Sequence, residues 1–211
     1  MTKNGAVPEI AGQSSNLRLW SAGSTREPLS TVSALPTSSP PLRPPPLQIA
    51  TRTNRVTLSR TGLVEHLDKV NEMHARCSPA SLYARYRGVR RALAKRDWEH
   101  LCDPANGTTM ITVPLDDPYR IIAVTHLMRT TTPHVRELGI LVEDSWQGQG
   151  LGTALARCMV DFARTQLLDC QAIRAMTSRD NQRSMSILRW LGAQFKGASG
   201  STIDALIRVE N

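Results

Sequence analysis

The chain has 211 residues, of which 40% are hydrophobic and 4% aromatic, and it carries a formal net charge of +8. This length suits one ordinary domain with an appendage. No apolar run approaches the ~18 residues of a membrane-spanning helix, which argues against a membrane protein. The four cysteines form no C-x-x-C pair and the five histidines do not cluster. The pattern therefore predicts no metal site, and a reducing cytoplasm is the expected location.

The excess of positive charge raises the question of nucleic-acid binding. The basic residues are scattered, apart from a cluster over residues 85–91 and the pair Lys95 and Arg96. The sequence holds neither an aromatic-interleaved RNA-binding motif nor a zinc finger. A solvated basic surface is the simpler interpretation, which makes nucleic acid an unfavoured partner. A positive face also suits the attraction of a small anionic ligand.

Residues 1–52 differ in composition from the rest of the chain. Eight of the 13 prolines fall here, among many serines and threonines. Such a segment buries too little apolar surface to offset the entropy lost on ordering. The sequence therefore predicts a disordered tail over 1–52 and a folded domain over 53–211. The stretch Ser39–Leu47 (SPPLRPPPL) favours polyproline geometry and leaves open a partner that binds proline motifs, although a plain linker is the simpler interpretation.

Hydrophobic periodicity and turn residues predict the elements of the domain in chain order. Strands are expected over residues 55–58, 109–113, 120–128, 135–142, 171–176 and 202–209. Helices are expected over residues 62–75, 78–87, 95–101, 151–166 and 180–191. This order predicts an α+β fold in which helices flank a mixed, mostly antiparallel sheet of about six or seven strands.

The segment Gln147–Thr153 (QGQGLGT) follows the apolar run Val135–Val142, which predicts a strand. Beyond it, apolar residues recur three or four positions apart, the period of a helix with one buried face: Leu151, Ala154, Leu155, Cys158, Met159 and Phe162. Glycines at a strand-to-helix junction let a ligand approach the backbone. The N–H groups of a helix start favour an anion, so the loop is a predicted phosphate site.

Three kinds of phosphate loop can be compared with this segment. A Walker A loop requires a lysine beside its last glycine, and none stands here. A dinucleotide fingerprint requires G-x-G-x-x-G, and Thr153 occupies its last position. The third kind is Q/R-x-x-G-x-G/A, and Gln147, Gly150 and Gly152 match all its defined positions. In this respect the segment resembles the acyl-CoA loop of the GNAT N-acetyltransferases.

The resemblance to that family extends on both sides of the loop. The segment Glu137–Val142 and the turn over residues 144–147 are similar to the family's E-x-A-x-x-V strand and D-x-W-Q turn. Downstream, Asn181 and Gly192 bound the segment NQRSMSILRWLG, which resembles the second cofactor motif, an Asn that opens a helix ending in L-G. Three linked motifs in family order make the resemblance specific.

The resemblance implies the GNAT acyl-CoA N-acyltransferase fold, whose central strands splay apart at the cofactor site, and acetyl-CoA as cosubstrate. It implies that backbone groups of the strand pair with the pantetheine arm as an added strand would, and that loop N–H groups hold the pyrophosphate. Asn181 has the alternative role of a helix cap. The implied cofactor residues are Leu141, Val142, Gln147, Gly148, Gln149, Gly150, Leu151, Gly152, Thr153, Asn181 and Ser184.

Acetyl transfer requires a neutral amine. With a pKa near 10.4, roughly one lysine-like amine in 2,500 is neutral at pH 7, so a base or desolvation must help. Glu137 stands in an otherwise apolar strand, where burial makes a carboxylate a stronger base, and the family often places a Glu there. Glu137 is therefore the predicted catalytic residue. The alternative is that Glu137 and Arg136 straddle an exposed edge.

The sequence departs from the family in the acid that protonates the leaving thiolate. Relatives often use a tyrosine in or just after the second motif helix, but no tyrosine follows Tyr119, and Trp190 stands in that region. The role is then left to water, to Ser184 or to another group.

The acceptor is less defined. The segment Ser78–Tyr86 (SPASLYARY) resembles the S-x-x-S-L-Y-x-R-F helix of a bacterial GNAT branch that includes protein lysine acetyltransferases. Because this region borders the acceptor in the family, the predicted acceptor residues are Tyr83 and Arg85. A packing face is the alternative. Protein lysines, amino acids, other small amines and antibiotics all stay open as acceptors.

The leading function is an acetyl-CoA-dependent N-acetyltransferase that acts on a primary amine by direct attack. The alternative is a catalytically weak GNAT-fold module that senses acyl-CoA or binds a partner, and the missing tyrosine supports it. A homodimer is compatible with the sequence. Purified protein, acetyl-CoA and a panel of amines would separate the two functions.

Overall fold

The computed structural model describes residues 43–88, 90–197 and 200–209. Within them, eight strands form one sheet in the order β1-β2-β3-β4-β5-β6-β8-β7. Every neighbouring pair is antiparallel except β5 with β6. The predicted α+β class with a mixed, mostly antiparallel sheet is confirmed. The strands are β1 (Leu47–Ala50), β2 (Val56–Thr61), β3 (Gly107–Pro114), β4 (Ala123–Arg129), β5 (Val135–Val142), β6 (Ala172–Ser178), β7 (Gln194–Lys196) and β8 (Thr202–Arg208).

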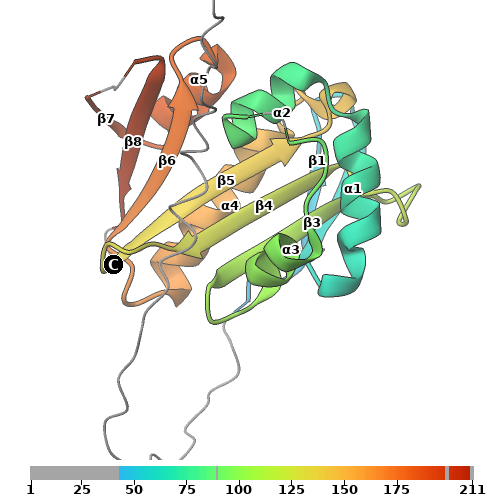
Figure 1. Ribbon diagram of the computed structural model, residues 1–211, viewed down its shortest axis with the longest axis horizontal. Coiled ribbons are helices and arrows are strands. Elements are labelled where there is room, and N and C mark those ends of the chain that lie inside the picture. Colours follow the sequence, from blue (N-terminus) through green and yellow to red (C-terminus); the bar gives the residue numbers. More distant parts are fainter. Residues whose placement is uncertain (1–42, 89, 198–199, 210–211) are drawn as a thin grey trace, which may run out of the picture. The chain divides into compact units, whose positions relative to one another are not determined.

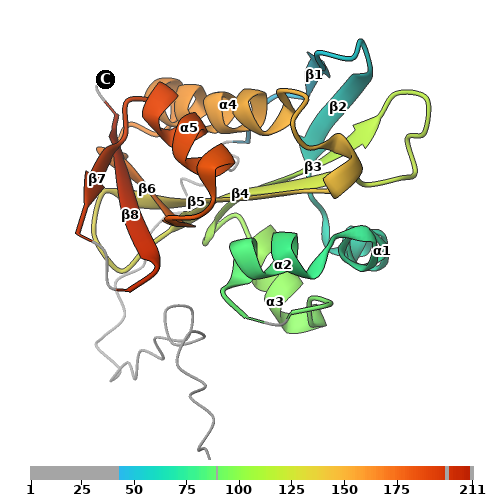
Figure 2. The ribbon, with the colours of Figure 1, turned by 90° about the horizontal axis from the view of Figure 1, so that it is seen from above.

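Helices cover both faces of this sheet. Figure 2 shows α1, α2 and α3 on one face and α4 and α5 on the other. The core is divided accordingly, with Met73 and Trp98 in the cluster of the first face and Met159 and Ile173 in that of the second. All four side chains are fully buried. The helices are α1 (Leu67–Arg76), α2 (Pro79–Tyr86), α3 (Lys95–Cys102), α4 (Leu151–Gln166) and α5 (Gln182–Trp190).

The sheet begins earlier in the chain than the sequence indicated. Leu47–Ala50 forms β1, antiparallel to β2, within the predicted tail 1–52. Ile49 is buried and belongs to one apolar cluster with Trp146. The strand is only four residues long and directly follows three prolines, which concealed its alternation. The predicted tail up to residue 42 lies outside the described residues.

A second short strand, β7, lies at the opposite edge of the sheet and pairs with β8. With β1 and β7, the described sheet has eight strands rather than six or seven. The helix predicted over 62–75 starts as a 3-10 turn at Val64–His66, and α1 begins at Leu67. Among the described residues, no helix has the length and apolar character needed to cross a membrane.

The parallel pair β5 and β6 fixes where the sheet opens. Its ladder covers only Val135–Glu137 on β5 and Ala172–Arg174 on β6. On its other edge, β5 stays paired with β4 along nearly its whole length. Figure 1 shows the two strands diverging from their shared end. In the described sheet, the edge of β5 that faces β6 therefore has no strand partner beyond Glu137.

Candidate active site

A cavity of about 920 Å³ occupies the divergence of β5 and β6. This volume lies near the upper end of the ~300–1,000 Å³ range of small-molecule sites. Residues from the second half of β5, from α2, from the phosphate loop and from α5 line it. The cavity thus joins segments that are far apart in the sequence and includes the unpaired edge of β5.

The predicted phosphate loop closes one end of the cavity. Gly148 and Gly150 have φ values of 71° and 91°, a left-handed conformation that glycine adopts without strain. Helix α4 begins directly after them at Leu151, so the first N–H groups of the helix have no partner within it. Five loop residues line the cavity: Gln147, Gly148, Gly150, Gly152 and Thr153.

The other two loop residues serve structural contacts. Leu151 is fully buried in the core. The Gln149 side chain donates to the Ser145 carbonyl at 2.8 Å and accepts a hydrogen bond from the Thr53 hydroxyl at 2.7 Å. Gln149 thereby ties the loop to the turn between β1 and β2. It supports the loop from outside the cavity.

The Gln147 side chain connects three walls of the cavity. Its Nε2 donates to the Ser81 hydroxyl of α2 at 2.9 Å and to the Val142 carbonyl of β5 at 2.8 Å. Its Oε1 accepts from Arg183 Nη1 of α5 at 2.9 Å. Because these contacts reach both sides of the splay, Gln147 sets the spacing between α2, the end of β5 and α5.

Three arginines near the phosphate loop were missed by the sequence interpretation. Arg52, Arg157 and Arg183 all line the cavity. Arg52 donates from its guanidinium to the Gly148 carbonyl and from its backbone to the Gln149 carbonyl. Positive charge beside the N-terminus of α4 strengthens an anion site. No local signal identified Arg52, because it follows a strand hidden in the proline-rich segment.

Asn181 and Ser184 both line the cavity at the start of α5. Asn181 is the N-cap of that helix, and its Oδ1 accepts from the Ser184 backbone N–H at 3.1 Å. The helix-cap role that was left open for Asn181 is therefore present. The cap occupies the carbonyl oxygen and does not require the amide NH2 group, so a ligand contact by that group is compatible with it.

Glu137 lies at the point where the strands part. It occupies the last rung of the parallel ladder, opposite Arg174, and it lines the cavity. Arg174 Nη2 donates to Glu137 Oε2 at 2.9 Å, and the Glu137 side chain is 24% exposed. Glu137 is therefore an ion-paired carboxylate at the cavity wall, in contrast to the isolated buried carboxylate that the apolar strand predicted.

Of the two predicted acceptor residues, Arg85 lines the cavity, whereas Tyr83 is 56% exposed and is not among the lining residues. The Arg85 guanidinium lies against Gly139 of β5. A Cβ atom added to Gly139 would be 2.4 Å from Nη2 and 2.6 Å from Cζ of Arg85. Glycine at position 139 thus makes the space that this guanidinium occupies.

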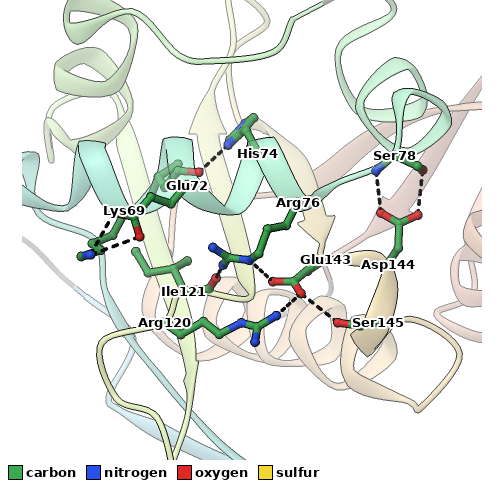
Figure 3. A network of polar contacts seen from close by, with 11 residues as sticks. Lys69, Glu72, His74, Arg76, Ser78, Arg120, Ile121, Glu143, Asp144 and Ser145 are labelled. Carbon is green, nitrogen blue, oxygen red and sulfur yellow. Dashed lines mark hydrogen bonds and ion pairs between the residues drawn. The ribbon is translucent and has the colours of Figure 1, made fainter.

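Polar contacts at the end of β5 hold the helices α1 and α2 in place. Glu143 accepts from Arg76 Nε of α1 at 2.9 Å, from Ser145 at 2.8 Å, and from Arg120; Figure 3 shows these side chains converging on it. Burial by itself raises the pKa of the Glu143 carboxyl. The hydrogen bonds from the two arginines and the serine outweigh burial and hold that pKa below its usual value.

Asp144 fixes the start of α2. It accepts from the Ser78 backbone N–H at 2.9 Å, from the Ser78 hydroxyl at 2.7 Å and from the Ser81 hydroxyl at 2.9 Å; the contacts with Ser78 are drawn in Figure 3. Burial raises its pKa, and these hydrogen bonds more than compensate, so the pKa is lowered. Because Asp144 opens the 3-10 turn Asp144–Trp146 that leads into the phosphate loop, α2 and the loop share one anchor.

Two buried histidines lie beneath α2. His74 Nε2 and the Tyr86 hydroxyl are 2.6 Å apart, and His126 Nδ1 is 2.9 Å from the Thr109 hydroxyl. His126 pairs with Gly139 in the β4–β5 register. Burial, and then the charge of Arg85, lowers the pKa of His126 well below its usual value. The imidazole of His126 is therefore neutral at physiological pH.

The described residues hold no group of three or more His, Cys, Asp or Glu side chains that could bind a metal ion. Apart from Tyr83, Gln149 and Leu151, the predicted site residues lie around one cavity, and its lining is rich in arginine. The sequence interpretation located the loop, Glu137, Arg85 and the start of α5. It did not locate Arg174, because that contact depends on the register of two strands that are distant in the chain.

Comparison with known proteins identifies the family. A family model described as an acetyltransferase (GNAT) domain matches residues 63–194. This match covers more than half of the 211 residues. Curated proteins give no significant sequence match.

Solved structures share the fold. The GNAT domain of S. lividans PAT has a TM-score of 0.68 and 16% identity, covering 77% of this chain and 96% of its own. Ribosomal-protein-S5-alanine acetyltransferase from Vibrio fischeri has a TM-score of 0.60 and 14% identity, and the match covers 74% of this chain and 94% of that protein. Mycobacterium smegmatis RimJ, in complex with CoA-disulfide, has a TM-score of 0.58 and 14% identity, covering 77% and 86%.

Proposed function

The chain belongs to the GNAT acetyltransferase family, and we propose that it transfers an acetyl group from acetyl-CoA to a primary amine by direct attack. The observation that carries this proposal is the early end of the β5–β6 ladder at Glu137. It leaves a strand edge without a partner inside a cavity that reaches the phosphate loop. The RimJ of similar fold was solved with a CoA-disulfide, which supports a CoA-type ligand for this cavity.

The chain's own groups suit the parts of that ligand. The free edge of β5 at Leu141 and Val142 offers backbone groups to the pantetheine amides, as in strand addition. The N–H groups of the loop and the N-terminus of α4 face the pyrophosphate. Arg52 and Arg183 line the same end of the cavity and supply positive charge. We expect the amide NH2 of Asn181, which lines the cavity at the start of α5, to contact the pantetheine.

Glu137 is the group that receives the proton of the acceptor ammonium, directly or through one water. The neutral amine then attacks the thioester carbonyl, the C–N bond forms, the C–S bond breaks and the thiolate takes up a proton. The ion pair with Arg174 holds the carboxylate toward the apex of the splay. Ser184 lines the cavity and, with water, is a candidate donor to the thiolate in place of the missing tyrosine.

Calorimetry with CoA, followed by an acetyl-transfer assay on a panel of amines, tests the proposal. Arg52→Gln should weaken CoA binding by about tenfold or more, because a charged hydrogen bond is worth about 1.5–3 kcal/mol. Arg60→Gln is the matched control, since Arg60 lies in the same hairpin, is exposed and is not a lining residue. Absence of CoA binding in the folded wild-type chain would refute the proposal. CoA binding without transfer to any amine would favour an acyl-CoA-sensing or partner-binding module.

A further inference from the structure

Two arginines on the α2 side of the cavity have unsatisfied donors. Arg85 lies in the last turn of α2, Arg87 is its C-terminal cap residue, and both line the cavity. Nε of Arg85 and Nη2 of Arg87 are buried without a hydrogen-bond partner. Neither guanidinium forms a salt bridge with a carboxylate of the described residues. Buried charged donors without partners are costly, so their presence in a cavity indicates an anionic ligand.

The position of Arg85 is set by the structure around it. Its guanidinium occupies the space over Gly139 that any larger residue would fill. The Asp144 contacts to Ser78 and Ser81 fix the other end of α2. Gly139 is two residues beyond Glu137 on the same face of β5. The positive charge of Arg85 is therefore held over the middle of β5.

The other charges of the cavity do not account for this pair. Glu137 is the one acidic residue among the described lining residues, and it is paired with Arg174 at 2.9 Å. The phosphate loop lies beyond the end of β5, where Arg52 and Arg183 already supply positive charge. The anion that Arg85 and Arg87 would bind thus lies in the part of the cavity between α2 and Glu137, away from the phosphate loop. We call this part the acceptor half.

We propose that the acceptor is an amine that carries a carboxylate a few bonds away, as an amino acid does, and that Arg85 and Arg87 bind this carboxylate. This inference rests on the acetyl transfer proposed above. Glu137 and Gly139 lie two residues apart on one face of β5, so their Cα atoms are roughly 7 Å apart, and the Arg85 guanidinium lies over Gly139. An acceptor whose amine reaches Glu137 and whose carboxylate reaches Arg85 therefore needs the two groups on the same small segment of the molecule.

Matched acceptor pairs test the proposal with acetyl-CoA and the full chain. One pair is leucine and leucinamide, and the other is a peptide that begins with Asp and the same peptide beginning with Asn. We measure the ratio of kcat/KM for acid over amide within each pair. Comparing this ratio between variants cancels the different basicity of the two amines. If the ratio changes more for leucine and leucinamide, the carboxylate is that of a free amino acid. If it changes more for the two peptides, the carboxylate is that of a peptide N-terminus.

Three variants separate the roles. Arg85→Gln should lower the acid-over-amide ratio at least tenfold, mainly through KM. Gly139→Ala keeps the charge but displaces the guanidinium by its Cβ, and it should lower the ratio in the same direction. Arg91→Gln removes one exposed charge that does not line the cavity and should leave the ratio unchanged. Thermal unfolding verifies that each variant is folded.

Several outcomes would overturn the acceptor class. If Arg85→Gln lowers kcat equally for acid and amide, Arg85 acts on the thioester carbonyl instead. If it weakens CoA binding and leaves the ratio unchanged, Arg85 binds the cofactor. Acetylation of a lysine peptide in preference to every carboxylate-bearing amine, or acetyl transfer to other amines with none to either member of a pair, also contradicts the proposal. Failure of acetyl transfer itself is distinct, because the wild-type chain would then bind no CoA, or would bind CoA and acetylate no amine of the panel.

Discussion

Gly150→Val is the sharpest test of the phosphate loop. Gly150 has a φ of 91°, a conformation in which a residue with a side chain is strained by about 1–3 kcal/mol. The added Cβ would meet Arg52 Cγ at 3.8 Å, which is ordinary van der Waals contact. The free chain therefore has no steric clash at this atom, and the cost to folding is limited to backbone strain. A branched side chain would nevertheless occupy the approach of a phosphate to the loop N–H groups.

We expect CoA affinity to fall at least tenfold in Gly150→Val, which equals about 1.4 kcal/mol. Isothermal titration calorimetry with CoA measures this loss, and urea unfolding measures the strain. Gly200→Val is the matched control, because Gly200 has a φ of 66° with no heavy atom within 4 Å of its added Cβ. It should show similar strain and normal CoA affinity. A Gly150→Val chain that binds CoA as tightly as the control would refute the assignment of the loop.

Three further predictions address catalysis, folding and pH. Glu137→Gln should lower kcat by about 10²–10⁴ at pH 7 with CoA affinity unchanged. The loss should shrink at high pH, where more of the acceptor amine is neutral. A near-normal kcat, measured where chemistry limits the rate, would contradict the role of Glu137 as the base. Ile49→Ala should destabilise the chain by about 2 kcal/mol in urea unfolding, because Ile49 is 7% exposed, whereas Gln48→Ala on the exposed face should cost little. His126 has a depressed pKa in the folded chain. Its neutral imidazole therefore contributes fully to the free energy of unfolding above the unfolded pKa near 6.5. That contribution is lost as the pH falls below about 6.5, by up to about 1.4 kcal/mol per pH unit. His126→Gln should flatten that decline in urea unfolding between pH 7 and pH 5, and an unchanged slope would exclude His126 as its cause.

The elements with a strong local signal were predictable from the sequence. The apolar period after the glycine loop predicted α4, and Leu151, Leu155, Met159 and Phe162 are buried as that period requires, whereas Ala154 and Cys158 are half-buried. The strand before the loop has the predicted bounds, Val135–Val142. In both segments the buried positions follow a pattern of apolar residues along the chain, and this pattern can be recognised in a single sequence.

The contacts that complete the site have no such local pattern. The Glu137–Arg174 pair depends on a parallel ladder of three rungs, and no periodicity within either strand specifies that register. Arg52 reaches the phosphate loop from a turn after a four-residue strand. Prolines and the short length of that strand favour a disordered interpretation of the segment. Pairing with β2 and the packing of Leu47 and Ile49 against the rest of the chain supply the missing stabilisation.

Gly139 illustrates why stability and function separate in this cavity. A glycine in the middle of a strand has a conformational cost relative to alanine, so Gly139→Ala has a favourable backbone contribution. The atoms that its Cβ would meet belong to the end of the Arg85 side chain, which can move at low cost because it is flexible. The substitution should therefore leave the free energy of unfolding within about 1 kcal/mol of wild type, in the range of tolerated substitutions. If Gly139→Ala instead unfolds the chain, the Arg85 guanidinium is fixed by contacts other than the one with Gly139. Glycine at position 139 would then be required for folding rather than for acceptor binding.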